Sequence, residues 1–337
     1  MTDIFFEDLA PGAVTTYGAH RVDRDEMTAF AREFDAQPFH VDEASARASA
    51  VGHLIASGWY TTAVQMRMLC DAWLLRSASL GGPGIEELKW LRPVVAGDLL
   101  SVRQTVLDAR VSRSRPEMGF VRFRMETLNG AGDAVMSQIH VGMFGRRDVT
   151  APAAGGAAEA RRPDTGPPAR PPSGPVLDAR CFEEVELGVV VPLGDYAFTP
   201  ENVVAFAGRY DPQPFHLSDE AARRSHFGRL AASGWHTGAA WMKSLVAHRT
   251  ASVARAAAEG ATPPRFGVSP GFRDLKWLRP VHAGETIRFA TEAVEKRPSA
   301  SRPGWGLVFS RNTGWNEAGE QVYEFTGGGF WGLRDAS

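Results

Sequence analysis

Two short segments of this 337-residue chain each place an aspartate five residues before a histidine. Asp35 and His40 lie in DAQPFH, and Asp211 and His216 lie in DPQPFH. Proline restricts its own backbone and that of the preceding residue, so these segments are not expected to be regular helix, and a turned segment brings both side chains to one point. A carboxylate beside an imidazole is a general acid/base pair, because histidine titrates near neutral pH and the carboxylate accepts a proton or orients water.

A structural role is the alternative for these segments. The aspartate would then end a helix, and the histidine would be a partly buried side chain bonded to backbone. The pattern D-x-Q-P-F-H is identical in the two segments, whereas most residues between 41 and 51 differ from their counterparts. This difference favours the acid/base interpretation.

A second pattern, Ala-Ser-Gly-Trp, contains Ser57 and Gly58 and recurs with Ser233 and Gly234. Each copy stands where a long apolar helix is expected to begin. The first amides of a helix lack partners within the helix and carry the positive end of its dipole, so the glycine amide could bind a carbonyl oxygen that becomes negative. The alternative is a serine N-cap followed by a glycine that permits close packing, and the two roles are compatible.

Other chemical patterns are weaker. His40, Asp42 and Glu43 could be imagined as metal ligands, but carboxylates at the start of a helix more often serve its dipole, so no metal site is predicted. Gly81–Gly84 lacks the residues of a phosphate-binding loop. Basic residues either lie on a solvated strand face or contact the phosphates of a nucleotide-bearing ligand. They are Arg110, Arg113, Arg115, Arg122 and Arg124 around one hairpin, and Lys89, Arg92, Lys276 and Arg279 elsewhere.

These patterns recur because the chain is a tandem repeat. Residues 29–62 match 205–238 at 18 of 34 positions with a shift of 176, and ELKWLRPVVAGD at 87–98 matches DLKWLRPVHAGE at 274–285 with a shift of 187. The change of shift reflects 11 extra residues around 249–266. Between the copies, residues 151–175 are almost entirely Ala, Gly, Pro and Arg and contain no large apolar side chain. We therefore predict domains at 1–147 and 178–337, joined by a linker at 148–177.

The hydrophobic pattern predicts the same elements in each copy. A strand (14–22; 189–198) precedes a short amphipathic helix, which begins after Asp23 in the first copy and after Thr199 in the second. The segment with aspartate and histidine follows, then the long apolar helix from Gly58 or Gly234. The last third alternates as strands do. A buried helix followed by an antiparallel sheet predicts an α+β fold.

Composition limits the classes of partner and the compartment. Lys and Arg number 37 against 39 Asp and Glu, for a net charge of -2, which argues against nucleic acid or an anionic membrane as partner. Cys70 and Cys181 are too few and too far apart for a disulfide framework, which favours a reducing compartment. With no signal-peptide pattern and no apolar run of about 18 residues, the expected location is the cytoplasm.

Taken together, the D-x-Q-P-F-H segment, the Ser-Gly helix start and the later L-R-P-V-x-A-G-D/E strand resemble the MaoC-like dehydratases, the (R)-specific enoyl-CoA hydratase or hydratase 2 group. The resemblance covers 5–147 and 181–334. It implies a double hot-dog fold, in which each domain is a long helix wrapped by an antiparallel sheet and the two pair as a pseudo-dimer. Two or more such units could further assemble as a homo-oligomer.

The resemblance implies reversible addition of water to a trans-2-enoyl-CoA, giving an (R)-3-hydroxyacyl-CoA. Asp35 with His40, and Asp211 with His216, would activate water, and the amide of Gly58 or Gly234 would stabilise the thioester oxygen, with Ser57 or Ser233 at the site edge. Coenzyme A would bind as part of the substrate, with no other cofactor, and Lys89, Arg92, Arg113, Arg115, Lys276 and Arg279 would be its candidate contacts.

The sequence departs from the family pattern at Gln37 and Gln213, where many members have Asn. Both copies keep the Asp/His pair, which predicts either two working sites or one site whose twin is blocked by packing. If only one works, His236 and the DPQPFH segment favour the second copy over the first, which has Tyr60 and DAQPFH. A hot-dog thioesterase and a non-catalytic acyl-CoA-binding protein remain the alternative functions.

Overall fold

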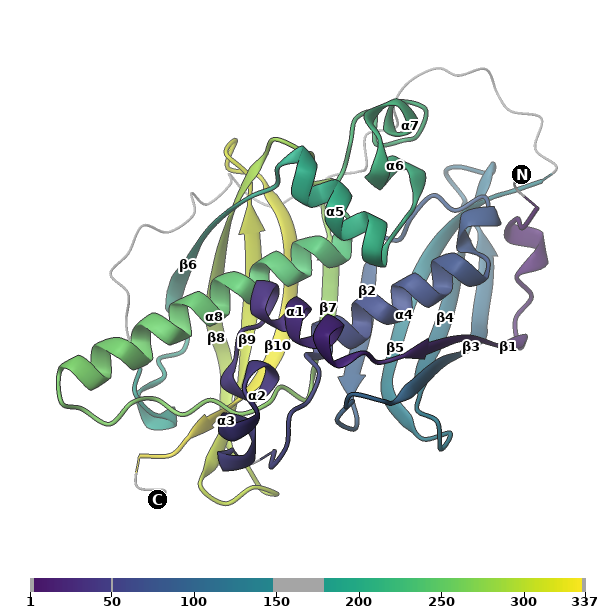
Figure 1. The fold of residues 1–337 in the computed structure, drawn as a ribbon. Coiled ribbons are helices and arrows are strands. Elements are labelled where there is room, and N and C mark those ends of the chain that lie inside the picture. Colours follow the sequence, from purple (N-terminus) through teal and green to yellow (C-terminus); the bar gives the residue numbers. More distant parts are fainter. Residues whose placement is uncertain (1–2, 50, 148–178, 335–337) are drawn as a thin grey trace.

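The computed structural model describes residues 3–49, 51–147 and 179–334. The predicted linker at 148–177 lies outside the described residues. The described strands form one antiparallel sheet in the order β1-β3-β4-β5-β2-β7-β10-β9-β8-β6 (Figure 1). The first copy contributes β1 (Val14–Arg21), β2 (Gly84–Trp90), β3 (Leu99–Val111), β4 (Met118–Leu128) and β5 (Ala134–Gly145). The second contributes β6 (Val190–Ala197), β7 (Gly271–Trp277), β8 (Thr286–Pro298), β9 (Trp305–Trp315) and β10 (Gln321–Gly332).

The two copies join where β2 pairs with β7, with Ile85 opposite Leu275. The backbones approach closely at the two ends of this pairing. A Cβ on Gly84 would lie 2.0 Å from the carbonyl oxygen of Leu275, and a Cβ on Gly271 would lie 2.1 Å from that of Leu88. Since only glycine avoids these collisions, the sequence provides for one continuous sheet across both copies.

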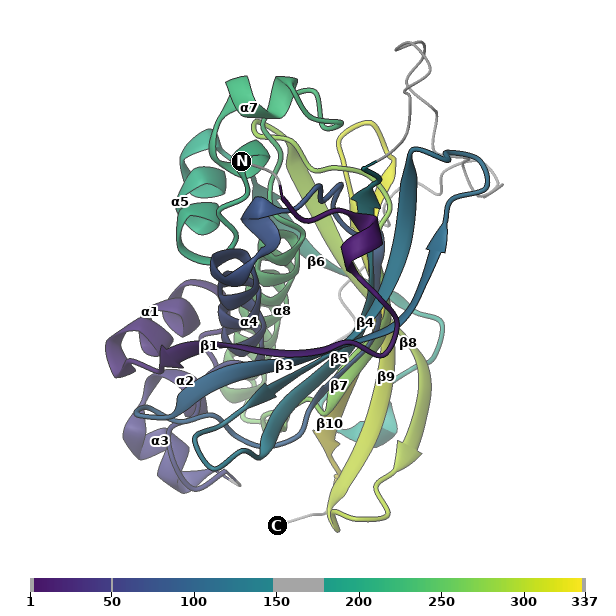
Figure 2. The same cartoon turned by 90° about the vertical axis from the view of Figure 1, so that its right-hand side faces the viewer.

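The helices cover one face of this sheet (Figure 2). The two long helices are α4 (Gly58–Ala72) and α8 (Gly234–Ala258), and the 3-10 turns are η1 (Phe6–Asp8), η2 (Leu74–Arg76) and η3 (Phe182–Glu184). The shorter helices are α1 (Arg24–Phe34), α2 (Pro38–Val41), α3 (Glu43–Ala48), α5 (Pro200–Tyr210), α6 (Pro214–Leu217) and α7 (Asp219–Arg223). In the described ranges, no helix combines the length and the apolar character that a membrane span requires.

The predicted helix starts are confirmed. The Asp23 side chain accepts hydrogen bonds from the amides of Asp25 and Glu26 at the start of α1, and Thr199 caps α5 with Pro200 as its first residue. The long helices differ, because α8 has 25 residues and α4 has 15. The additional turns of α8 lie in the region where the second copy carries its extra residues, and they add a helical wall that the first copy lacks.

The hydrophobic core is shared between the copies. Phe30 of α1 packs edge to face on Tyr210 of α5 at 5.5 Å, and Phe34 packs on Phe206 at 5.7 Å. Trp59 of α4 stacks on Phe272 of β7 at 5.4 Å. Each copy therefore completes its core against the other, so that the α+β prediction is confirmed and the halves form one pseudo-symmetric unit.

Candidate active site

The Asp35–His40 segment is a break between two helices. Asp35 ends α1 with φ -146° and ψ 59°, and Pro38 is the first residue of the single turn α2, which carries His40. Proline suits this first helical position because its missing amide has no partner to lose there. The second copy repeats the break at Asp211. The prediction that the segment is not regular helix is therefore confirmed, apart from the short turn that presents the histidine.

The Asp35 carboxylate is held by three side chains. Ser57 Oγ donates a hydrogen bond to Oδ2 at 2.6 Å, and Gln37 Nε2 donates one to Oδ1 at 2.9 Å. His40 Nε2 lies 3.5 Å from Oδ2. Asp35 and His40 are both buried. The glutamine at position 37, which departs from the family pattern, thus orients the carboxylate directly.

The tautomer of His40 follows from its backbone contact. His40 Nδ1 lies 2.9 Å from the carbonyl oxygen of Ile55, and since a carbonyl only accepts, Nδ1 must carry a proton. In the neutral imidazole, Nε2 is then an acceptor, and it faces Asp35 Oδ2, which is also an acceptor. Two acceptors 3.5 Å apart are arranged to receive the two hydrogens of one water molecule.

Gly58 begins α4 directly beside this pair. Ser57 is the N-cap, and its Oγ accepts from the amide of Trp59 while it donates to Asp35. A Cβ on Gly58 would lie 2.4 Å from Cε2 of Trp90, whose indole donates to the carbonyl of Gly58 at 3.0 Å. The cap and the close packing are therefore confirmed, whereas the role of the Gly58 amide as an oxyanion donor stays a prediction.

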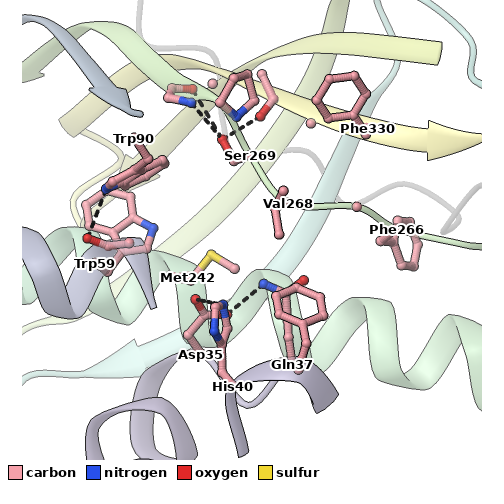
Figure 3. A pocket seen from close by; sticks show the side chains of 18 of the residues that line it. Asp35, Gln37, His40, Trp59, Trp90, Met242, Phe266, Val268, Ser269 and Phe330 are labelled. Atoms are coloured by element: carbon pink, nitrogen blue, oxygen red, sulfur yellow. Dashed lines mark hydrogen bonds and ion pairs between the residues drawn. The ribbon is translucent and has the colours of Figure 1, made fainter. Parts of the chain in front are cut away.

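A cavity of about 1030 Å³ opens on the first copy's pair. Asp35, Gln37 and His40 form one wall, and Ser269 and Phe330 of the second copy lie opposite them (Figure 3). Gly58 also lines the cavity. Further lining residues from the second copy are Met242, Leu245, Arg249, Thr291, Ser310, Asn312 and Gly327. The site is thus composite, with the polar pair from one copy and most of the opposing surface from the other.

The second copy's pair has the same internal geometry. Ser233 Oγ donates to Asp211 Oδ2 at 2.6 Å, Gln213 Nε2 donates to Oδ1 at 2.9 Å, and His216 Nε2 lies 3.5 Å from Oδ2. One contact is additional, because the Cys70 thiol of α4 donates to Asp211 Oδ1 at 3.6 Å. Burial and the neighbouring Asp211 charge raise the pKa of this thiol, so it remains protonated and acts as a donor.

The residues that correspond to the cavity wall are bulkier on the side of Asp211. The repeat register relates the cavity-lining Arg249, Ser310 and Gly327 to bulky residues of the first copy, namely Trp73, Phe123 and His140. Trp73 stacks on Phe144 at 5.9 Å, and Phe123 stacks on His140 at 5.2 Å. Neither described cavity, whether of about 1030 or about 270 Å³, is lined by Asp211 or His216.

This geometry runs against the expectation that a single working site would be in the second copy. His236, on which that expectation was based, is fully buried. Its Nε2 is hydrogen-bonded to the hydroxyl of Tyr196 at 3.2 Å. The first copy makes the same contact with the two residue types exchanged, between His20 and Tyr60 at 3.1 Å. His236 is therefore one half of an exchanged core pair and no indicator of a working site.

Most basic residues predicted to contact coenzyme A lie away from the cavity. Of the six, only Arg92 lines it. The others with an ionic partner are Lys89 with Glu87, Arg115 with Glu117, Lys276 with Glu324 and Arg279 with Glu320. Arg113 is exposed and is not a lining residue. Glu87 and Glu117 lie two residues from their partners in the sequence, whereas Glu320 and Glu324 are distant in sequence and are brought to Arg279 and Lys276 by the fold.

Three arginines line the cavity without having been predicted: Arg249, Arg265 and Arg302. A signal existed for Arg302, because SASRP at 299–303 matches SRSRP at 112–116 and so identifies it as the counterpart of Arg115. Arg249 gave no such signal, because its counterpart at the shift of 176 is Trp73, and Arg265 lies among the 11 extra residues, for which the first copy offers no comparison.

Asp42 and Glu43, which with His40 were candidate metal ligands, have other partners. Asp42 caps α3 by accepting from the amide of Ser45, and Glu43 pairs with Arg24 at 2.6 Å. Across residues 3–49, 51–147 and 179–334, no group of three or more His, Cys, Asp and Glu side chains is arranged to hold a metal ion.

Both copies of the chain match one known family model. The model described as MaoC like domain matches residues 10–122 and 189–303, once in each copy. The chain belongs to the MaoC-like domain family. This MaoC-like chain is 27% identical over 248 residues to the mesaconyl-CoA hydratase of Haloarcula hispanica, a match that covers 71% of the chain and 66% of that relative. It is 28% identical over 123 residues to the protein YdeM of Bacillus subtilis, a match that covers 36% of the chain and 86% of that protein.

Solved structures show the same fold over the whole length. A MaoC domain dehydratase of Chloroflexus aurantiacus superposes with a TM-score of 0.78 at 15% identity, covering 98% of this chain and 97% of that one. A Mycobacterium tuberculosis protein described as a double hotdog fold superposes with a TM-score of 0.69 at 16% identity, covering 97% and 98%. The predicted double hot-dog is therefore confirmed for this MaoC-like chain.

Proposed function

We propose that this MaoC-like protein is an acyl-CoA hydratase/dehydratase, which adds water reversibly across the C2=C3 bond of a trans-2-enoyl-CoA to give an (R)-3-hydroxyacyl-CoA. The observation that carries the proposal is the pair of acceptors, Asp35 Oδ2 and His40 Nε2, at 3.5 Å on the wall of the cavity beside the Gly58 amide. Family membership and the relatives named as hydratases support the reaction class.

The proposed reaction uses one water molecule. Its hydrogens point to Asp35 and His40, so a lone pair of its oxygen faces C3 of the substrate. As the C3–O bond forms, one proton passes to an acceptor of the pair and the π electrons move onto the thioester oxygen, to which the Gly58 amide donates. The electrons then return, and C2 takes a proton from the same pair, so that both additions occur on one face. An oxyanion donor of this kind contributes about 3–4 kcal/mol.

We further propose that only the Asp35/His40 site turns over substrate. The Asp211/His216 pair keeps the same distances, but Cys70 donates to Asp211, and the bulky Trp73 and Phe123 stand at the positions of the cavity-lining Arg249 and Ser310. Its network then serves as structure: Asp211 ends α5 and ties the start of α8 to α6 through Ser233 and Gln213.

The experiment compares Asp35→Asn with Asp211→Asn, a matched pair of changes in equivalent positions, using crotonyl-CoA as substrate. Asp35→Asn is expected to lower kcat by about 10² to 10⁴, the usual effect of removing an acid/base group, whereas Asp211→Asn retains near-normal activity. Full activity in Asp35→Asn would refute the proposed mechanism, and an equal loss in both variants would refute the single site. Release of free CoA thiol without a hydrated product would instead identify a thioesterase.

A further inference from the structure

One cation in the cavity has no role in the proposed chemistry. Met242, Leu245 and Arg249 follow one another on α8 at spacings of three and four residues, and all three line the cavity. Residues so spaced share one helix face. The first copy has Trp73 at the equivalent position, directly after α4 ends. The guanidinium is thus a feature of the Asp35 side of the pseudo-symmetric unit alone.

Arg249 lacks an anion. Within the part of the chain that the structure describes, no carboxylate oxygen lies within 4.0 Å of its guanidinium, which instead lies 4.5 Å from the centre of the Phe266 ring. Loss of solvent lowers the pKa of Arg249 to about 10, against an opposing influence from the negative charge of Asp35. The side chain is therefore still charged at neutral pH, and a half-buried charge without an anionic partner is unfavourable.

The wall beside Arg249 is polar. Thr291 Oγ1 donates to Asn312 Oδ1 at 2.8 Å, and Asn312 Nδ2 donates to the carbonyl of Ser310 at 2.9 Å. All three residues line the cavity, and Thr291, Ser310 and Arg249 also line the adjoining cavity of about 270 Å³. The equivalent residues of the first copy are Gln104, Phe123 and Met125. A hydrocarbon acyl chain would gain little from this wall, whereas an acyl group with a charged end would be solvated by it.

We propose that Arg249 is a specificity-determining residue that binds a carboxylate on the acyl group of the substrate, so that this site takes a short enoyl-CoA whose acyl group carries a second, free carboxylate. The inference rests on the proposed function. At 1.5 Å per residue, about 10 Å of helix separates Arg249 from Met242, and Met242 lies beside Asp35 and His40 (Figure 3). An arginine side chain reaching back along this wall leaves room for a few carbon atoms between the double bond and the guanidinium. A planar guanidinium binds a carboxylate through two parallel hydrogen bonds.

The test uses two substrates that differ only in the proposed anchor. Mesaconyl-CoA carries a carboxylate where tigloyl-CoA carries a methyl group, and both have a 2-methyl-2-enoyl thioester. In the wild type, kcat/KM for mesaconyl-CoA should exceed that for tigloyl-CoA. Arg249→Met should lower kcat/KM for mesaconyl-CoA by about tenfold to a hundredfold, the usual effect of losing a hydrogen bond to a charged group, and leave tigloyl-CoA within about threefold. For mesaconyl-CoA, the kcat/KM of Arg249→Lys should fall between those of the wild type and Arg249→Met, because lysine keeps the positive charge and loses the paired hydrogen bonds of the guanidinium.

Binding to catalytically impaired protein separates this inference from the proposed reaction. In Asp35→Asn protein, adding Arg249→Met should weaken mesaconyl-CoA binding, measured by calorimetry, and leave the binding of tigloyl-CoA and of free CoA unchanged. Equal weakening of all three ligands would overturn the inference, since Arg249 would then contact a phosphate of coenzyme A. A wild type that prefers tigloyl-CoA would also overturn it. If neither thioester is hydrated but mesaconyl-CoA binding depends on Arg249, the proposed reaction fails and the anion site stands.

Discussion

Trp73 and Arg249 occupy equivalent positions in the two copies, one residue beyond the point at which α4 ends. Trp73 packs on Phe144, whereas Arg249 lines the cavity opposite Asp35. The two aspartates keep the same distances to their serine, glutamine and histidine partners. The copies have therefore diverged in the side chains opposite the pair and not in its polar geometry.

Replacement of Trp73 should open the second site. The test combines Trp73→Ala with Phe123→Ser in the inactive Asp35→Asn background. The two changes remove the bulky side chains opposite Asp211 and should restore measurable hydration of crotonyl-CoA. Removing a buried aromatic side chain costs about 3–5 kcal/mol, so thermal unfolding must show that the variant is folded at the assay temperature. The restored activity should disappear when Asp211→Asn is added. Activity that persists without Asp211 would contradict the explanation.

Ser57 should matter to catalysis and Ser233 only to stability. Each hydroxyl donates to its aspartate at 2.6 Å and also caps its helix. Ser57→Ala removes a hydrogen bond to a charged acceptor, worth about 1.5–3 kcal/mol, so we expect kcat to fall about tenfold to a hundredfold. Ser233→Ala is the matched control. Both variants should unfold at lower denaturant concentration, but a comparable loss of kcat in Ser233→Ala would show that both sites work.

Gly58 should not tolerate a methyl group. A Cβ there would meet Trp90 at 2.4 Å, and a Cβ on Gly234 would meet Trp277 at 2.3 Å. Overpacking typically costs about 1–3 kcal/mol, so Gly58→Ala and Gly234→Ala should lower the free energy of unfolding to a similar degree. Only Gly58→Ala should also lower kcat, because it displaces the amide at the working site. Trp90→Leu should relieve the collision and recover stability in the Gly58→Ala background. If stability does not recover, the collision with Trp90 is not the cause of the loss.

Acid should destabilise the fold through His236, which is fully buried, and His140, which is half-buried. Burial lowers the pKa of His140 to about 4 and that of His236 to about 3, against 6.5 for the ordinary side chain. Below pH 6.5 the unfolded chain binds protons that the native state does not, so stability falls as pH decreases towards 4. Each histidine contributes about 1.4 kcal/mol per pH unit in this window. Denaturant unfolding at a series of pH values measures the slope.

The exchanged pair supplies the control for His236. Tyr196→His with His236→Tyr reproduces the arrangement of His20 and Tyr60 and keeps a histidine–tyrosine hydrogen bond. It moves the histidine from a fully buried helix position to a half-buried strand position. The double variant should lose about 1.4 kcal/mol per pH unit of acid sensitivity relative to the wild type, and it should be more stable than either single variant. An unchanged slope would exclude His236 as a source of acid sensitivity.

Short contiguous patterns were enough to predict the polar groups of the site. Asp35 and His40 are five residues apart, and Ser57 and Gly58 are adjacent, so their roles depend on local backbone geometry that proline, glycine and helix caps impose. The repeat was likewise visible as identical residues, and with it the presence of two such constellations. The family resemblance then implied the double hot-dog, which the structural comparisons confirm.

Only the tertiary structure decided that the Asp35/His40 constellation lines a large cavity. Each Asp/His pair faces the long helix and sheet of the other copy, so its access depends on side chains such as Phe123 and Ser310 that are far from it in sequence. The same reason explains the basic residues: Lys89 and Lys276 are exposed on strands and paired with carboxylates, while Arg249 is turned into the cavity by an extension of α8. Local sequence determines what a loop can do, and packing between the copies determines what can reach it.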